Sequence, residues 1–483
     1  MATPTIPNGE EYFFPVIYEG NGAGQRVGKF VPFTDNGTIA NSVIFNDGDS
    51  PKLAITPSSN GNRRTWTFSA WIKRGVFGQK AFFSWDNTAP GGGGGGDFRF
   101  DSSHRLQLVA GGATAMNLTS NRTFEDSSKY YHIYIKVDTT QSTASDRVEI
   151  YVDGDKITSF STSTYPSQNK DFNINNTSYE TRFGALNDNG SLTSYFDGYL
   201  AEVNFVDGTN PAVSTFGVTD TSTGRWIPKT LSGITYGTNG FRLEFGTDSA
   251  LGDDTSGNTN DFTATNLAST DQTTDSPTQN HATLSPHSLY KSSNFTLSEG
   301  NLKATSTSTA GTHSGQGGMR IPNGGKYYWE CEIDAGKDGM GIGIIPADTP
   351  TTSANPSTAT LYLSNGSMRT DGSNAISYGS GVSNGDIMGF ALDLSNPANG
   401  KLYVSVNGTY ENNGNPVTGA NPAPANPLIG DFRVIYQDGS NGYTPVYIYN
   451  FGQKSFNTAP PTGFSALQQD NLPETAKGIS GLV

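Results

Sequence analysis

The sequence predicts an all-β protein with two antiparallel β-sandwich (jelly-roll) domains in tandem, preceded by an extended N-terminal segment. Three observations predict this class. Several runs alternate apolar and polar residues, which is the period of a strand with one buried face. Glycine and proline, at 59 and 25 of 483 residues, supply many turns. No stretch of about a dozen residues has the apolar period of a helix.

The clearest strand signal spans residues 65–73. Period two places its apolar residues on one core face: Trp66, Phe68, Ala70 and Ile72. Residues 132–138 repeat the pattern and place three more side chains inward: Ile133, Ile135 and Val137. Residues 147–152 follow it again and run into Asp153-Gly154, a dipeptide that favours a hairpin turn. Residues 401–406 run into Asn407-Gly408 in the same manner.

Charge and composition exclude several classes of protein. The 30 basic and 44 acidic residues give a net charge of −14, which disfavours binding to nucleic acid or to anionic membranes. No window reaches the ~18 apolar residues of a membrane span, and residues 1–7 lack the pattern of a signal peptide. A single cysteine, Cys331, excludes an intramolecular disulfide and a cysteine-based zinc site, and its strand context predicts a small core residue.

The length of the chain, 483 residues, is too great for one core. Residues 248–283 are dense in Asp, Asn, Ser, Thr and Gly, a composition that predicts a linker or a loop packed along its neighbours. We therefore divide the chain into an N-terminal attachment and oligomerisation segment (1–41), a first sandwich (42–266), a polar linker (267–285), a second sandwich (286–466) and a C-terminal tail (467–483).

Three motifs of the first sandwich resemble laminin-G-like domains of the concanavalin type. They are the run Trp66-Thr67-Phe68-Ser69-Ala70-Trp71-Ile72-Lys73-Arg74, the hairpin Val148-Glu149-Ile150-Tyr151-Val152-Asp153-Gly154 and the closing strand Phe196-Asp197-Gly198-Tyr199-Leu200-Ala201-Glu202-Val203. Their order along the chain is that of the family, and together they cover about residues 42–262. The resemblance implies a jelly roll for this half of the chain.

The second sandwich resembles a SPRY domain. The motifs that carry the resemblance are Lys326-Tyr327-Tyr328-Trp329-Glu330, Gly385-Asp386-Ile387-Met388-Gly389-Phe390-Ala391-Leu392-Asp393, Gly400-Lys401-Leu402-Tyr403-Val404-Ser405-Val406-Asn407-Gly408 and Tyr449-Asn450-Phe451-Gly452-Gln453. Four motifs in the family's order are a specific signal.

The two modules together resemble large structural proteins of tailed bacteriophages, notably marine ones. The resemblance implies a virion component, most simply a tail fibre or similar appendage that adheres without catalysis to a glycan or protein on the host surface. Its partners would be other virion proteins and further copies of itself, with a trimer favoured. The alternative is a capsid or tail decoration protein, and the rival from another class is a polysaccharide depolymerase. The role rests on analogy of fold.

An apolar and aromatic run near the N-terminus is the predicted virion anchor. Its side chains are Tyr12, Phe13, Phe14, Ile17 and Tyr18. A segment this apolar outside a sandwich should pack against something, and fibres attach by their N-termini.

Candidate receptor-binding side chains flank a run of six glycines, residues 91–96, that predicts a flexible loop tip. Aromatic rings stack on sugars, and loop tips carry contacts in receptor-binding proteins. The candidates are Trp85, Phe98, Arg99 and Tyr378. The alternative for each aromatic residue is a place in the core, where most Trp and Phe of a sandwich lie.

No pattern predicts an enzyme. Residues 381–385 fit the G-x-S-x-G pattern of serine hydrolases, but they precede a strand and no helix follows, so a loop is expected. Glu332-Ile333-Asp334 lacks the third acid of a glucanase motif. No cofactor is expected, although bound calcium stays an open alternative with four loop acids available: Asp97, Asp101, Asp188 and Asp197. Three histidines in polar stretches are expected at the surface: His281, His287 and His313.

Overall fold

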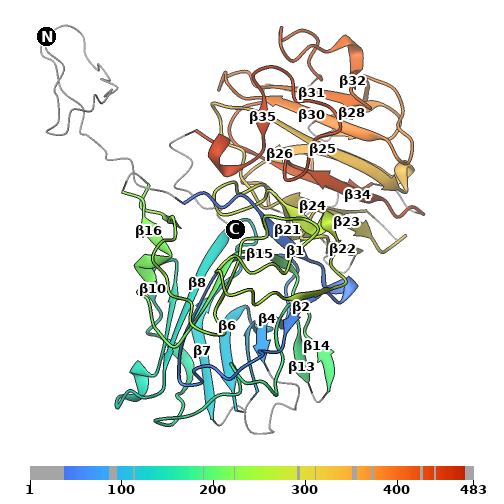
Figure 1. The fold of residues 1–483 in the computed structure, drawn as a ribbon. Coiled ribbons are helices and arrows are strands. Elements are labelled where there is room, and N and C mark those ends of the chain that lie inside the picture. The colour runs from blue at the N-terminus through green and yellow to red at the C-terminus, as the bar shows by residue number, and fades with distance from the viewer. Residues whose placement is uncertain are drawn as a thin grey trace, which may run out of the picture. The chain divides into compact units, whose positions relative to one another are not determined.

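The computed structural model describes residues 37–85, 95–111, 115–188, 190–221, 223–290, 294–309, 312–350, 356–370, 375–424, 428–439 and 442–473. Residues 37–483 form one compact unit, separate from residues 1–36. The described residues form strands and single turns of 3-10 helix (Figure 1), so the predicted all-β class is confirmed. Every ladder between described strands is antiparallel except one short parallel pair.

Two sheets make the first sandwich. The strands of sheet I, in spatial order, are β10 (Asp155–Lys156), β9 (Val148–Val152), β8 (Tyr130–Asp138), β3 (Thr65–Arg74), β15 (Gly198–Asp207), β1 (Ser42–Phe45) and β20 (Gln272–Thr273), with β18 (Phe241–Leu243) beside β15. Those of sheet II are β11 (Phe160–Thr164), β7 (Met116–Thr123), β6 (Arg105–Ala110), β5 (Gly96–Phe100), β4 (Lys80–Trp85), β12 (Thr181–Phe183), β2 (Lys52–Ile55) and β19 (Thr263–Thr265).

Two further sheets make the second sandwich. Sheet III contains β21 (Leu284–Tyr290), β24 (His313–Gly317), β33 (Phe432–Asp438), β26 (Met340–Pro346), β27 (Thr360–Leu363), β28 (Ser367–Arg369) and β29 (Ile376–Ser377). Sheet IV contains β22 (Phe295–Ser298), β23 (Lys303–Ser306), β34 (Val446–Asn450), β25 (Lys326–Ala335), β30 (Ile387–Asp393), β31 (Lys401–Val406) and β32 (Thr409–Tyr410), with β35 (Ser465–Ala466) parallel to β25.

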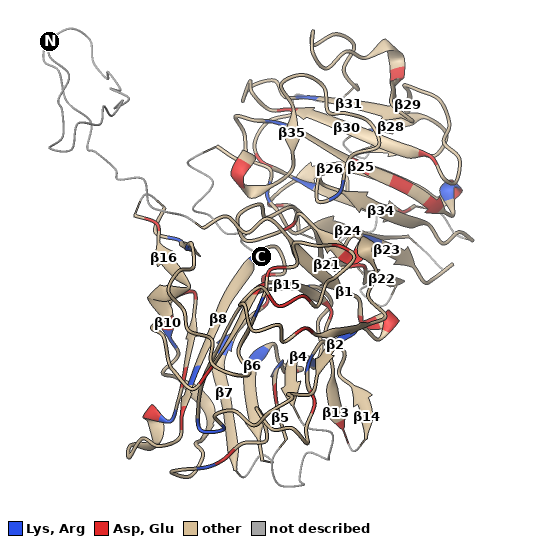
Figure 2. Cartoon of the chain, viewed as in Figure 1, with Lys and Arg blue, Asp and Glu red and all other residues tan. Residues whose placement is uncertain are grey.

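Smaller elements lie outside these sheets. Two hairpins pair β13 (Leu186–Asp188) with β14 (Ser191–Thr193), and β16 (Gly217–Thr219) with β17 (Trp226–Pro228). The 3-10 turns are η1 (Asp47–Asp49), η2 (Ala144–Asp146), η3 (Val213–Thr215), η4 (Ser269–Asp271), η6 (Lys337–Gly339), η7 (Glu411–Asn413) and η8 (Gln469–Asn471). Basic and acidic residues are distributed over both sandwiches rather than segregated (Figure 2).

The aromatic core between sheets I and II follows the predicted alternation. Trp66, Phe68, Ala70 and Ile72 are fully buried, and so are the three apolar residues of β8 that were predicted inward. The ring of Phe68 lies 4.9 Å from that of Phe83 in sheet II. Contacts between aromatic rings add to the burial of large apolar area. Alternation in sequence therefore located the core face of both strands.

The opposite face of sheet I is also covered, which alternation did not predict. Thr67, Ser69 and Lys73 are as buried as the core residues between them. Over one part of this face an apolar cluster brings Phe216 and Tyr236 against Tyr134 and Val206 of sheet I. Over another part, aromatic residues of sheet I join the core of the second sandwich; the hydroxyl of Tyr199, for example, donates to the Gly300 carbonyl at 2.8 Å.

The polar segment between the sandwiches packs along its neighbours, the second of the two alternatives for its composition. Thr273, Asp275, Ser276 and Asn280 are buried in it. The single cysteine, Cys331, is a core residue as predicted.

Two histidine predictions are wrong. His281, 2% exposed, and His313, fully buried, were expected at the surface. Distant segments cover both rings and supply polar partners: Nδ1 of His281 lies 3.2 Å from the carbonyl oxygen of Phe451, and Nε2 of His313 lies 3.5 Å from Oδ2 of Asp438.

Both predicted hairpin turns are present. Asp153 and Gly154 have φ of 54° and 82°, and Asn407 and Gly408 have φ of 49° and 81°. Two consecutive left-handed residues match the right-handed twist of the flanking strands. The first of these turns, between β9 and β10, lies beside the candidate site described below.

Candidate functional site

A cleft of about 220 Å³ remains open on the outer face of sheet I, between the segment that carries β17 and the segments that flank the second sandwich. Trp71 and Tyr130 of sheet I line it, and the other side chains that the argument uses are Lys129, Asp153, Arg225, Trp226, Asn280 and Gln469. We call it the Trp226 cleft. Its residues come from positions between 71 and 469, so only the folded chain assembles it.

Trp226 is a half-buried indole fixed in place by hydrogen bonding. Its Nε1 donates to Nδ1 of His132 at 3.0 Å, and Nε2 of His132 lies 2.9 Å from Oγ of Ser69. The indole is only a donor, so Nδ1 of His132 accepts, and its Nε2 carries the proton and donates to Ser69. Burial lowers the pKa of His132 to about 3, which keeps this tautomer neutral at ordinary pH.

The rings around Trp226 form a stack. His132 lies 5.9 Å from Trp226 with 25° between the planes, and 4.8 Å from Trp71. Two glycines make room for the indole: a Cβ on Gly154 or on Gly217 would come within 2.5 or 2.4 Å of its ring atoms. A ring held by a stack, a hydrogen bond and two glycines is preorganised, since little conformational entropy remains to be lost on binding.

Charged groups occupy the rim near the β9–β10 turn. Oδ1 of Asp153 accepts the backbone N–H of His132 at 2.9 Å. Its Oδ2 lies 3.3 Å from Nζ of Lys129 and 3.6 Å from Nη2 of Arg122. Asp153 therefore has two cationic partners. Asp155, at the start of β10, is exposed and also lines the cleft.

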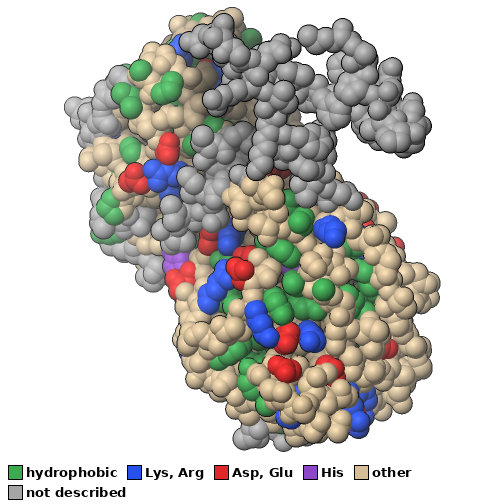
Figure 3. Space-filling model, turned by 90° about the vertical axis from the view of Figure 1, so that its left-hand side faces the viewer, with side chains coloured by type: hydrophobic (Ala, Val, Ile, Leu, Met, Phe, Trp, Pro, Cys, Tyr) green, Lys and Arg blue, Asp and Glu red, His purple; other side chains and the backbone are tan. Residues whose placement is uncertain are grey.

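The opposite wall comes from segments on either side of the second sandwich. Asn280 donates to the carbonyl of Ser128 at 2.8 Å, and the backbone N–H of Gln469 donates to the carbonyl of Asn280 at 2.8 Å. Oε1 of Gln469 accepts from Nη2 of Arg225 at 3.0 Å. On the face that bears β10 and β16, hydrophobic side chains lie among basic and acidic ones (Figure 3).

The side chains proposed from sequence lie elsewhere. Trp85 is 2% exposed, Phe98 0% and Tyr378 7%. The ring of the core residue Trp66 lies 5.9 Å from that of Trp85 and 6.1 Å from that of Phe98. These three therefore occupy core positions, the alternative that the sequence left open. Arg99 is paired with Asp97 at 2.8 Å.

Trp226 was not a candidate from sequence. It follows Gly224 and Arg225 in a short polar stretch outside any long alternating run. A tryptophan in such a place has no strand pattern that would assign it to a core. The lack of such a pattern was the one signal in the sequence that could have indicated a functional role for Trp226.

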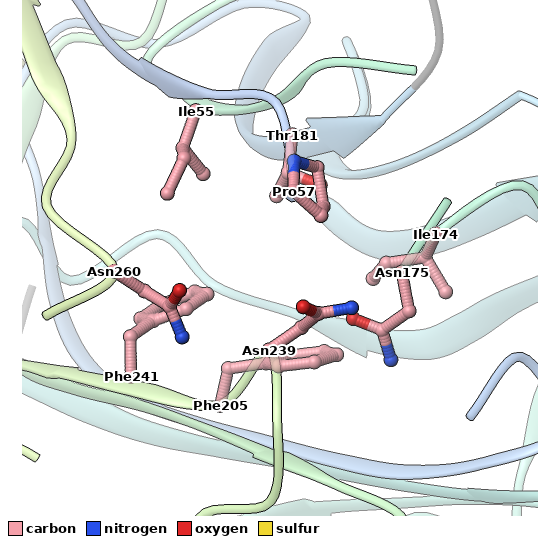
Figure 4. Close-up of a pocket in the computed structure, with 9 residues that line it drawn as sticks. All are labelled: Ile55, Pro57, Ile174, Asn175, Thr181, Phe205, Asn239, Phe241 and Asn260. Atoms are coloured by element: carbon pink, nitrogen blue, oxygen red, sulfur yellow. The ribbon is translucent and has the colours of Figure 1, made fainter. Parts of the chain in front are cut away.

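A narrow cavity at one end of the first sandwich is too small for a ligand (Figure 4). Phe205, Phe241 and three asparagines are among its lining residues, and its volume is about 10 Å³. One water needs roughly 10–15 Å³. The Asn239 and Asn260 amides donate to the carbonyls of Ser59 and of Thr238 and Gly240, so they close the end of the core.

A second cleft of about 220 Å³ is acidic. Glu202 and Glu244 line it, and both are paired with Arg242, at 2.6 and 2.8 Å. Burial raises the pKa of Glu202, against the effect of Arg242. One guanidinium therefore holds both carboxylates.

The predicted calcium candidates do not converge. Asp101 is paired with Arg105, and Oδ1 of the buried Asp197 accepts the N–H of Val76. In the part of the chain that the structure describes, no three His, Cys, Asp or Glu side chains gather in a manner that could hold a metal ion. Residues 381–386 form a loop before β30, as predicted, and not a nucleophile elbow.

The predicted virion anchor, Tyr12, Phe13, Phe14, Ile17 and Tyr18, lies outside the described residues. Within the described ranges, no helix is long and apolar enough to cross a membrane.

Comparison with known proteins bears on the fold. Residues 47–211 match the family model described as the concanavalin A-like lectin/glucanases superfamily, in its laminin G form. The first sandwich is laminin-G-like. The match includes β3, β8 and β9, the strands that carry Trp71, His132 and the turn beside Trp226. No curated protein sequence matches the chain.

The chain is similar, at low identity, to several solved structures. The SPRY domain of human HERC1 is 15% identical, covers 36% of this chain and 99% of its own, and has a TM-score of 0.29. A putative carbohydrate binding protein from Bacteroides ovatus is 14% identical. The match covers 47% of this chain and 60% of that protein, with a TM-score of 0.34. Domains LG4-5 of the mouse laminin α1 chain are 10% identical. The match covers 93% of this chain and 90% of those domains, with a TM-score of 0.26. These likenesses concern fold alone.

Proposed function

We propose that this chain is a non-catalytic adhesin that binds carbohydrate in the Trp226 cleft. The observation that carries the proposal is the half-buried indole of Trp226, which lines the cleft and is fixed by His132 beside charged and amide groups. An aromatic face can stack on a sugar ring while nearby donors and acceptors take its hydroxyls. The cleft's volume of about 220 Å³ lies below the ~300–1,000 Å³ of pockets for drug-sized ligands, and it suits a single sugar unit of a longer glycan.

The setting that we propose is a bacteriophage virion, on a tail fibre or similar appendage, where the chain would meet a glycan of the host surface. The laminin-G-like fold of the first sandwich and the SPRY-like motifs of the second support this setting. The net charge of −14 is consistent with a surface that stays soluble at high copy number.

The binding function is tested with the full-length chain on an array of bacterial surface glycans. We expect saturable binding to a subset of glycans, no new reducing ends, and loss of at least about tenfold in affinity for Trp226→Ala. Val417→Ala, at a side chain 57% exposed in the second sandwich, is the matched control. Unchanged binding by Trp226→Ala would reject the cleft, and new reducing ends would indicate a depolymerase.

The virion setting needs its own test. An antibody against the chain, applied to phage particles made by a genome that encodes it, should mark the appendages in electron micrographs. Labelling confined to the capsid would favour a decoration protein instead, and particles without the chain would contradict the setting while leaving the sugar site untouched.

A further inference from the structure

Arg225 has a charge that no carboxylate of the described residues pairs with directly. Among the described residues, its side chain donates one hydrogen bond, from Nη2 to Oε1 of Gln469, a neutral acceptor. Burial lowers the pKa of Arg225, while Asp470, Asp220 and Asp153 act at longer range to raise it. The rim carboxylate of Asp153 is engaged by Lys129 and Arg122. The guanidinium therefore stays charged, and it has further N–H donors besides the one that binds Gln469.

Arg225 lines the same cleft as the aromatic ring of the site. Arg225 immediately precedes Trp226, and both side chains line the same cleft. The turn that presents them is closed by backbone hydrogen bonds between Asp220 and Arg225 and between Gly224 and Asp220. Gln469 then fixes the guanidinium from the opposite wall. A sugar bound in the cleft would therefore have both Trp226 and Arg225 in its walls.

We propose that the sugar bound in the Trp226 cleft carries a carboxylate, as a uronic acid does, and that Arg225 binds this carboxylate. The fork of a guanidinium matches a carboxylate with two parallel hydrogen bonds, which adds orientation as well as attraction. Asp155 at the exposed rim accepts from sugar hydroxyls. Gln469 is a positioning residue, because it contacts Arg225 and not the carboxylate. This inference rests on the carbohydrate-binding function proposed above.

The test compares acidic oligosaccharides with the same oligosaccharides after their carboxylates have been reduced to alcohols. The full-length chain is titrated with oligouronates of known composition, such as oligogalacturonate, oligoalginate and oligosaccharides that contain glucuronate. We expect at least one to bind about tenfold or more tightly than its reduced form, and this preference to shrink as salt rises.

Three variants assign the preference to residues. Arg225→Gln should lose far more affinity for the uronate than for the reduced sugar, so that the preference disappears, whereas Arg225→Lys should retain part of the preference. Gln469→Ala should weaken uronate binding less than Arg225→Gln does. Val417→Ala should match the wild type, and equal melting temperatures show that all variants fold.

The outcomes separate this inference from the function on which it rests. Equal affinity for acidic and reduced sugars, both lost in Trp226→Ala, would overturn the role of Arg225 and keep the carbohydrate site. A uronate preference that persists in Arg225→Gln would also overturn it. Binding of neither form, with Trp226→Ala unchanged on the whole glycan array, would overturn both.

Discussion

Nζ of Lys73 lies 2.8 Å from Oδ2 of Asp275, and neither side chain is exposed to solvent. Lys73 belongs to β3 of the first sandwich, and Asp275 belongs to the segment that leads to the second. The same ammonium donates to Oδ1 of Asn280 at 2.9 Å and to the carbonyl of His281 at 2.8 Å. All three of its donors are used. The pair therefore fastens the wall of the Trp226 cleft to sheet I.

Replacement of Lys73 by methionine should destabilise the chain strongly. It leaves the Asp275 carboxylate buried without its charged partner, a loss of about 3–5 kcal/mol in the free energy of unfolding. Denaturant unfolding followed by tryptophan fluorescence measures the effect. The double variant Lys73→Met/Asp275→Leu removes both charges and should recover much of the loss; a double variant less stable than Lys73→Met would contradict this account.

His132 should make stability depend on pH. Burial lowers its pKa from 6.5 to about 3. Between these pH values the imidazole is protonated in the unfolded chain and neutral in the folded chain. The contribution of this group to stability is therefore complete above pH 6.5 and falls as the pH drops toward 3, by about 1.4 kcal/mol for each pH unit.

The variant His132→Asn isolates this effect from other titrating groups. The difference in unfolding free energy between wild type and variant, measured from pH 7.5 to pH 4, should change by several kcal/mol in favour of the variant. A difference that stays constant over this range would mean that His132 is protonated in the folded chain, and that its Nδ1 does not accept from Trp226.

Gly217→Ala should displace the Trp226 ring. A Cβ at this position would come within 2.4 Å of the indole, and the backbone of Gly217 does not itself require glycine. We expect a red-shifted tryptophan emission from a more exposed ring and weaker glycan binding. Gly246→Ala is the matched control, since its Cβ would meet no atom within 4 Å. Equal emission spectra and affinities for both variants would show that Gly217 does not hold the indole in place.

Deletion of residues 1–40 should abolish incorporation of the chain into particles and leave both sandwiches folded. Of the described residues the truncation removes only 37–40, among which Ile39 is buried and its carbonyl accepts from Ser276 and Thr278, so the melting temperature should fall without loss of the fold. Particle composition, measured by mass spectrometry after complementation with the truncated gene, checks the first part. Circular dichroism and the melting temperature check the second. Normal incorporation of the truncated chain into particles would show that the N-terminal segment is not the virion anchor.

Local patterns in the sequence determined the class of fold, the inward faces of β3 and β8 and the two hairpins. Alternation and the Asp153-Gly154 and Asn407-Gly408 turns act over a few residues, so their physical effect can be seen without the rest of the chain. The resemblance of the first module to laminin-G-like domains was visible for the same reason, in short strand motifs. Residues 381–385 could be predicted as a loop because a strand, and not a helix, follows them.

Only the tertiary structure decided which polar residues are buried and where a ligand could bind. Lys73 alternates with core residues as a solvent-facing lysine would, yet it is buried because a segment about 200 residues later covers it. His281 and His313 are buried by contacts of the same long range. The Trp226 cleft combines positions from Trp71 to Gln469. Packing between distant segments leaves no local pattern in sequence, and for that reason Trp226 and Arg225 emerged only from the folded chain.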